Sequence, residues 1–285
     1  MPSTRSPSRP RRLTVRVAQV SAVVLVVCVA LVVTGAVRSP FWYTVGGDLD
    51  LARSARSGVR VLFVGNSFTY RNDLPGMLHR LAAADPGAPP VFAVGFTAPG
   101  ATLARASRQR KLRELLRDVR WHDVVLQEQS TLPSLPSEQR VREMDPYVRD
   151  LHAAVSADGE QTVLLMTWAY RDGDRRRVPN DTFAAMQARI ARTYADLALT
   201  LPARLAPVGL AWEEALRRDP GLELWARDGR HPSRAGTYLA ACVLYARLVG
   251  RSPAGSAFTA GLDPREAAIL REAAVAATPA PATAR

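Results

Sequence analysis

The sequence predicts an α/β protein: a three-layer sandwich with a central, mainly parallel sheet of five strands between two layers of helices. Short β-branched and apolar runs alternate with longer stretches of helical periodicity, the pattern of a parallel sheet covered on both faces. The 285 residues, 47% of them hydrophobic, suffice for one large core. Two cysteines and 22% charged residues exclude a disulfide scaffold and a wholly disordered chain.

Each predicted strand is short and rich in apolar residues. The five strands are expected over Val59–Val64, Val91–Val94, Asp123–Leu126, Thr162–Met166 and Ala203–Val208. Leu74–Ala84 has apolar residues at positions 74, 77, 78 and 81, the spacing of one buried helix face. Further helices are expected over Ala101–Val119, Glu138–Val155, Thr182–Leu199, Arg234–Val249 and Asp263–Ala276. Asp181 and Asp263 are the expected N-caps of the helices that follow them.

The N-terminal region predicts a membrane anchor or a signal peptide. Val17–Val37 contains 21 residues without a charge, and a helix of that length spans about 30 Å, the thickness of a bilayer's hydrocarbon core. Five arginines precede it, so the positive-inside bias leaves residues 1–16 in the cytoplasm and the later residues outside. An uncleaved helix gives a single-pass cell-membrane protein, whereas cleavage near Thr34 or Ala36 gives a secreted one.

The part beyond the predicted membrane segment divides into three regions. Residues 38–57 predict a linker, residues 58–277 hold the predicted strands and helices, and residues 278–285 predict a disordered tail. Half of the net charge of +12 comes from residues 1–38, which hold six arginines and no acid. Because no recognition motif accompanies this charge, nucleic acid is not an expected partner. No sequence feature indicates an oligomeric state.

Candidate catalytic residues lie in two predicted loops. Ser67 follows the first strand in Gly65-Asn66-Ser67, and active groups of open α/β sheets collect at the carboxyl ends of strands. A serine there serves as a helix cap or as a nucleophile whose own N–H helps hold an oxyanion. Asp228 and His231 lie three residues apart before a late helix. At this spacing the carboxylate can orient the imidazole, which then takes a proton from a serine hydroxyl.

These motifs, Gly65-Asn66-Ser67 and Asp228-x-x-His231, resemble the SGNH/GDSL hydrolase family over about Val59–Val249. The resemblance implies a flavodoxin-like fold and a Ser-His-Asp triad of Ser67, His231 and Asp228. It also implies an oxyanion hole made by the N–H groups of Ser67 and Gly100 and by a side-chain amide.

The third block of the motif departs from the family. The family places Gly-x-Asn-Asp after its third strand, whereas this chain has Gln127-Glu128-Gln129-Ser130. A glutamine amide offers the same N–H donor as asparagine. Gln129 is therefore the expected third oxyanion donor, with Gln127 as the alternative. Glu128 is expected to be solvated or ion-paired.

The resemblance implies a serine esterase that removes a small acyl group, such as acetyl, from a glycan or another ester outside the cytoplasm. Trp168 and Tyr170 follow the fourth predicted strand and are expected at the rim of the site, where aromatic faces pack on sugars. This chemistry requires no metal and no cofactor. Two alternatives are an acyltransferase that uses the same triad and a non-catalytic envelope-binding module.

Overall fold

The computed structural model describes residues 43–157 and 159–278. Within these ranges, no helix combines the length and the apolar character that crossing a membrane requires. The anchor or signal peptide predicted over residues 17–37 lies outside the described residues, as do the predicted cytoplasmic tail and residues 279–285 of the predicted disordered tail.

The described strands form one six-stranded sheet in the order β1-β3-β2-β4-β5-β6. They are β1 (Thr44–Gly46), β2 (Val59–Gly65), β3 (Val91–Thr97), β4 (Asp123–Leu126), β5 (Gln161–Leu165) and β6 (Arg204–Ala206). β1 pairs antiparallel with β3, and all the other pairs are parallel. Without β1, the strand order reads 2-1-3-4-5, which is the flavodoxin-like winding. The mainly parallel sheet is confirmed, and the prediction of five strands is corrected to six.

The additional strand lies in a segment that the sequence assigns to a linker. Thr44 pairs with Thr97, and Gly46 pairs with Gly95. A three-residue strand is too short to show a periodic pattern, which is why the sequence gives no sign of it. Helix α2 (Leu49–Ser54) follows, and its N-cap Asp48 accepts a hydrogen bond from the N–H of Leu51. Part of the predicted linker is therefore folded onto the edge of the sheet.

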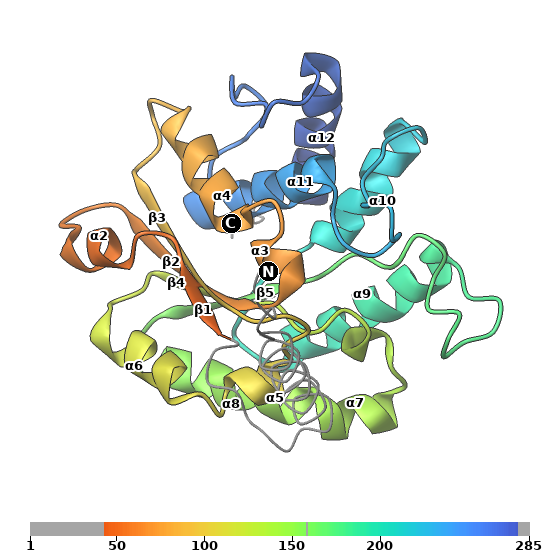
Figure 1. Cartoon of the computed structure of the whole chain (residues 1–285), viewed down its shortest axis with the longest axis horizontal. Coiled ribbons are helices and arrows are strands. Elements are labelled where there is room, and N and C mark those ends of the chain that lie inside the picture. Colours follow the sequence, from red (N-terminus) through yellow and green to blue (C-terminus); the bar gives the residue numbers. More distant parts are fainter. Residues whose placement is uncertain (1–42, 158, 279–285) are drawn as a thin grey trace, which may run out of the picture. The chain divides into compact units, whose positions relative to one another are not determined.

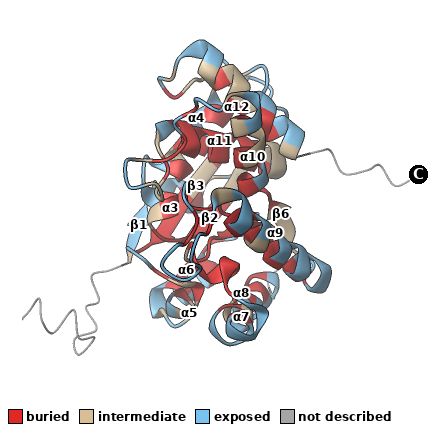
Figure 2. Cartoon of the chain, turned by 90° about the vertical axis from the view of Figure 1, so that its right-hand side faces the viewer, coloured by how far each residue is buried: buried red, intermediate tan, exposed pale blue. Residues whose placement is uncertain are grey.

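Helices cover both faces of the sheet (Figure 1). One layer contains α4 (Leu74–Ala83), α10 (Val208–Arg218), α11 (Arg234–Leu244) and α12 (Pro264–Ala277). The other layer contains α5 (Leu103–Ala106), α6 (Arg110–Asp118), α7 (Ser137–Glu143), α8 (Asp145–Ser156) and α9 (Phe183–Thr200). Figure 2 shows the buried residues concentrated on the sheet and on the helix faces that pack against it.

Several helix boundaries differ from the predicted ones. Glu138–Val155 forms two helices because the chain leaves helical geometry at Met144, just before Pro146 opens α8. The N-cap of α9 is Thr182, whose side chain accepts from the N–H of Ala185. Asp181 does not cap α9, since its carboxylate binds the Arg189 guanidinium. Asp263 caps α12 as expected.

The strand register brings the ends of the central strands to one edge of the sheet. Gly65 pairs with Thr97, and Val64 pairs with Leu126, so β2, β3 and β4 end at the same level. The loops that leave these strands carry Ser67, Gly100 and Gln129. This common edge is where an open α/β sheet places its functional groups.

Candidate active site

The turn after β2 holds Ser67 at the start of the short helix α3 (Ser67–Tyr70). A side chain at Gly65 would lie 2.6 Å from Oε1 of Gln127, so this position has no room for one. Asn66 caps α3 by accepting from the N–H of Phe68, and its amide donates to the carbonyl of Ala101 at 2.9 Å. The turn therefore depends on close packing of the strand ends, and it leaves Ser67 half-buried.

The structure brings Ser67, His231 and Asp228 together. Ser67 Oγ lies 2.9 Å from His231 Nε2. His231 Nδ1 lies 2.5 Å from Asp228 Oδ2, and Asp228 Oδ1 accepts the backbone N–H groups of Arg230 and His231 at 3.0 Å each. With the Nδ1 proton directed to the carboxylate, Nε2 is free to accept the Ser67 proton.

The electrostatics of Asp228 favour its ionised form. Partial burial opposes ionisation, but the hydrogen bonds from the His231 ring and from the two backbone N–H groups outweigh it. Together they lower the pKa of Asp228 to about 2. The carboxylate is therefore charged throughout the neutral pH range, so it can hold the imidazole in one orientation.

Asn72 connects the Ser67 helix to the His231 loop. Its side-chain amide lies 3.0–3.1 Å from three acceptors, which are the carbonyls of Pro232 and Ser233 and the Thr237 hydroxyl. Its backbone is left-handed, with φ 54°. Asparagine adopts this conformation more readily than most residues. Sequence reasoning missed Asn72 because its partners lie about 160 residues further along the chain.

The Gly100 turn lies beside the Ser67 turn. The N–H of Ala98 donates to the carbonyl of Gly65 at 3.3 Å, and the Asn66 amide binds Ala101 on the other side of Gly100. Gly100 has φ +58° and is exposed. Among the described residues, no acceptor takes the N–H of Gly100 or that of Ser67. Both donors are thus available to a bound group.

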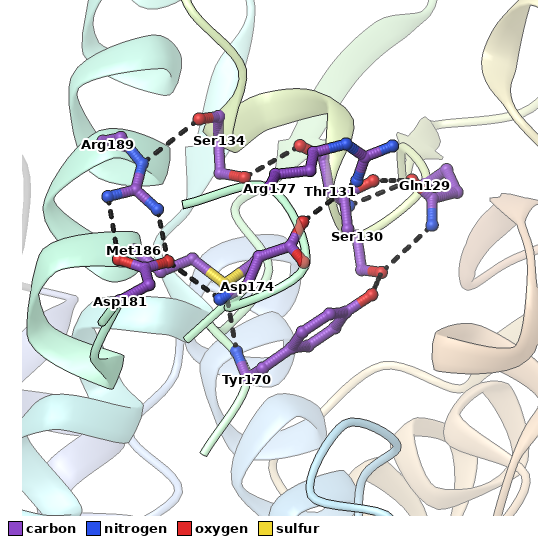
Figure 3. Close-up of polar contacts among 10 residues, drawn as sticks. All are labelled: Gln129, Ser130, Thr131, Ser134, Tyr170, Asp174, Arg177, Asp181, Met186 and Arg189. Atoms are coloured by element: carbon purple, nitrogen blue, oxygen red, sulfur yellow. Dashed lines mark hydrogen bonds and ion pairs between the residues drawn. The ribbon is translucent and has the colours of Figure 1, made fainter. Parts of the chain in front are cut away.

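The two glutamines after β4 have different surroundings. Gln127 is buried, and its Oε1 accepts from the N–H of Asn66 at 2.9 Å and from the Thr69 hydroxyl at 3.0 Å. These two hydrogen bonds fix the turn that carries Ser67. Gln129 is half-buried, and Thr131 occupies its Oε1 with both its N–H and its hydroxyl. This contact turns the Gln129 amide nitrogen toward Ser130, 3.3 Å away (Figure 3).

Glu128, expected to be solvated or ion-paired, is fully buried and in no ion pair of the described residues, which corrects the expectation of solvation. β4 ends at Leu126, so the alternation of faces along a strand does not extend to Glu128. Its carboxylate accepts the N–H of Leu103 at 3.1 Å and that of Gln129 at 2.6 Å. Burial raises the pKa of Glu128 to about 8, although these two hydrogen bonds act in the opposite direction.

Trp168 does not lie at the rim, which is a second correction. It is 1% exposed and stacks between Phe68 and Trp212, with centroid distances of 4.6 and 4.2 Å. Phe68 in turn meets the His231 ring edge-on at 5.6 Å. The indole N–H of Trp168 donates to the carbonyl of Arg230 at 3.0 Å, so Trp168 supports the His231 loop from within the core.

Tyr170 is also largely buried, but it lines a surface cavity. Its hydroxyl lies 2.7 Å from Ser130 Oγ, and the Arg230 guanidinium lies 5.0 Å from its ring centroid (Figure 3 shows the Ser130 contact). The cavity has a volume of about 160 Å³ and adjoins the Asp228–His231 loop; its lining comprises residues 170, 172–176 and 228–230.

Among the described residues, no group of three or more His, Cys, Asp or Glu side chains is placed to hold a metal ion.

Comparison with solved structures identifies the family of the chain. No family model and no curated protein matches the chain. A solved protein from Slackia heliotrinireducens, assigned to the SGNH hydrolases, is 32% identical; the match covers 67% of this chain and 98% of that one, with a TM-score of 0.56. The chain therefore belongs to the SGNH/GDSL hydrolase family, a family of ester-bond hydrolases.

Two further solved structures share the fold. A DUF4886 family protein from Bacteroides uniformis is 19% identical, with a TM-score of 0.65 over 76% of this chain and 93% of that one. LAE5, an α/β hydrolase enzyme from the metagenome of Lake Arreo, is 15% identical, with a TM-score of 0.52 over 67% and 95%. At these identities the likeness concerns the fold alone.

Proposed function

We propose that this protein is an extracytoplasmic serine hydrolase that removes a small acyl group, such as acetyl, from an ester. Ser67 Oγ attacks the ester carbonyl carbon while His231 Nε2 takes its proton. His231 then gives this proton to the leaving alcohol. A water molecule, deprotonated by the same ring, attacks the acyl-enzyme, and the acid is released as Ser67 regains its proton. The observation that carries the proposal is the continuous Ser67–His231–Asp228 contact.

The carbonyl oxygen becomes negatively charged during each attack. In this proposal the N–H groups of Ser67 and Gly100 and the side-chain amide of Gln129 stabilise that charge. Support comes from the two unengaged N–H groups and from Thr131, which occupies the Gln129 amide oxygen, so that the amide nitrogen, which gives one N–H to Ser130, has a second N–H to donate. Loss of one such donor costs on the order of 3–4 kcal/mol in the transition state.

The identity of the alcohol is the second part of the proposal. An acylated glycan was the expectation, based on Trp168 and Tyr170 as stacking platforms. Trp168 is buried and Arg230 covers the Tyr170 ring, so neither offers a free aromatic face. The proposal therefore specifies the substrate as an ester of a small acyl group and does not assign its alcohol to a glycan. Release of acetate from an acetylated polysaccharide, measured beside a simple acetate ester, tests for a glycan.

The proposed location rests on the charge asymmetry around residues 17–37. Alkaline phosphatase fused after Arg285 tests it, because this reporter folds into active enzyme only outside the cytoplasm. Reporter activity is expected. An inactive but intact fusion contradicts the proposed orientation.

Hydrolysis of p-nitrophenyl acetate by the purified full-length protein tests the activity. The parent protein is expected to turn over, and Ser67→Ala is expected to fall to the uncatalysed rate. Ser54→Ala is the matched control, since Ser54 is exposed on α2 and bonds only within that helix. Equal rates for the parent and Ser67→Ala would eliminate Ser67 as the nucleophile. Turnover that appears only with a sugar acceptor would point to acyl transfer.

A further inference from the structure

We propose that the cavity beside the Asp228–His231 loop binds a small anionic group, a carboxylate or a phosphate, that the ester substrate carries. This inference rests on the proposed hydrolase function and narrows its substrate class to anionic esters. The cavity has a volume of about 160 Å³, which is enough for a carboxylate or a phosphate group. Asp228, Gly229 and Arg230 line it and directly precede His231, so a group bound there lies beside the loop that carries the catalytic base.

Three arginines line this cavity, namely Arg175, Arg176 and Arg230. Arg230 lies over the Tyr170 ring, and Arg175 donates through Nε to the carbonyl of Asp181, which leaves its terminal nitrogens available. In the part of the chain that the structure describes, no carboxylate pairs with Arg176 or Arg230. Guanidinium groups bind carboxylates and phosphates through paired hydrogen bonds.

Most of the acidic side chains in the lining are already engaged. Asp174 binds Arg177 at 3.0 Å, and Asp228 binds the His231 ring at 2.5 Å. Because the His231 ring is neutral when it serves as the base, Asp228 keeps its negative charge, and Asp172 is in no ion pair of the described residues. Three guanidinium groups thus stand against two carboxylates, those of Asp172 and Asp228, so the lining keeps a net positive charge that favours an anion.

Hydrogen bonds of the buried Asp181 fix the loop that carries Arg175 and Arg176. Asp181 is 2% exposed, and both its oxygens bind Arg189, at 3.0 and 2.6 Å. It also accepts the N–H of Asp174 at 2.8 Å, and Figure 3 shows this network beside Tyr170. A preorganised loop loses less conformational entropy when a ligand binds. The structure therefore holds the backbone of these arginines in place before the substrate arrives.

Two pairs of aryl esters test the inference on the full-length protein. In one pair the anion is in the acyl part: mono-4-nitrophenyl adipate is compared with 4-nitrophenyl hexanoate. In the other it is in the alcohol part: 4-acetoxybenzoate is compared with methyl 4-acetoxybenzoate. At low salt, kcat/KM for at least one anionic ester is expected to exceed that of its neutral partner about tenfold. The pair that shows the preference identifies the part of the ester that carries the anion.

Variants of the arginines test whether the preference for the anionic ester arises in this cavity. Arg176→Gln and Arg230→Gln are expected to lower the anionic-to-neutral ratio toward one, whereas the control Arg227→Gln retains it. Arg227 is exposed in the same loop but does not line the cavity. A ratio near one in the parent protein, or a ratio that both arginine variants leave unchanged, overturns the inference while the hydrolase function stands. Absence of turnover for every ester, p-nitrophenyl acetate included, overturns the proposed function instead.

Discussion

Replacing Glu128 by glutamine is expected to stabilise the protein increasingly as the pH rises. Burial raises the pKa of Glu128 to about 8 in the native state, against 4.5 for an ordinary glutamate. Between these values the folded protein binds more protons than the unfolded chain, so the free energy of unfolding falls as the pH rises. The slope for one group is about 1.4 kcal/mol per pH unit, which adds up to about 5 kcal/mol across the window.

Glutamine removes this titration and keeps the local contacts. Its Oε1 still accepts the N–H groups of Leu103 and Gln129, which both lie within 3.1 Å of Glu128 Oε1. Asp123 also has a raised pKa, about 6, because of its burial, but it contributes equally to the parent and the variant. The difference between the two proteins therefore isolates Glu128.

Urea denaturation at pH 5, 6, 7 and 8 measures this difference. The curves of the parent and of Glu128→Gln are expected to diverge by up to about 1.4 kcal/mol for each pH unit within the window. Glu138→Gln is the control, because Glu138 is exposed on α7. Parallel curves for the parent and Glu128→Gln would refute the reasoning that burial governs this carboxyl.

Three further substitutions test the site. Asp228→Asn is expected to lower kcat about 10⁴-fold without unfolding the protein, because the ring loses its oriented tautomer; a kcat within tenfold of the parent would contradict this. Gln129→Ala is expected to lower kcat 10²- to 10³-fold with little change in KM, the mark of a transition-state donor, and an unchanged kcat would remove it from that role. Asn72→Ala is expected to reduce kcat and to cost about 1 kcal/mol in thermal unfolding, because the hydrogen bonds that tie the chain after α3 to the His231 loop are lost. Unchanged unfolding and kcat would show that Asn72 does not fix the His231 loop.

Much of the fold and the loops that carry Ser67, Asp228 and His231 followed from local sequence, whereas the contact between Ser67 and His231, 164 residues apart, was implied by the family resemblance. The strand that ends at Gly65 has a continuous apolar run, and parallel strands must end at one edge. The Asp228 carboxylate reaches His231 across three residues, so this contact also depends on short-range geometry. These features are local and therefore readable from spacing.

The features that sequence reasoning missed depend on long-range contacts. Trp168 follows a strand as a rim residue would, but the packing of Phe68 and Trp212 buries it. Glu128 shows the same limit, since its burial depends on Leu103, 25 residues earlier in the chain. One miss was local instead: the prediction extended the last strand to Val208, where α10 begins.

Labelling with a fluorophosphonate probe tests the central claim most directly, because such probes bond covalently to activated serine hydroxyls. After brief exposure to the probe and digestion, mass spectrometry is expected to find the adduct on Ser67 in the parent protein. Labelling is expected to fall sharply in His231→Ala, which retains the serine but lacks the base. An unmodified Ser67, or equal labelling in His231→Ala, would contradict the claim that His231 activates Ser67.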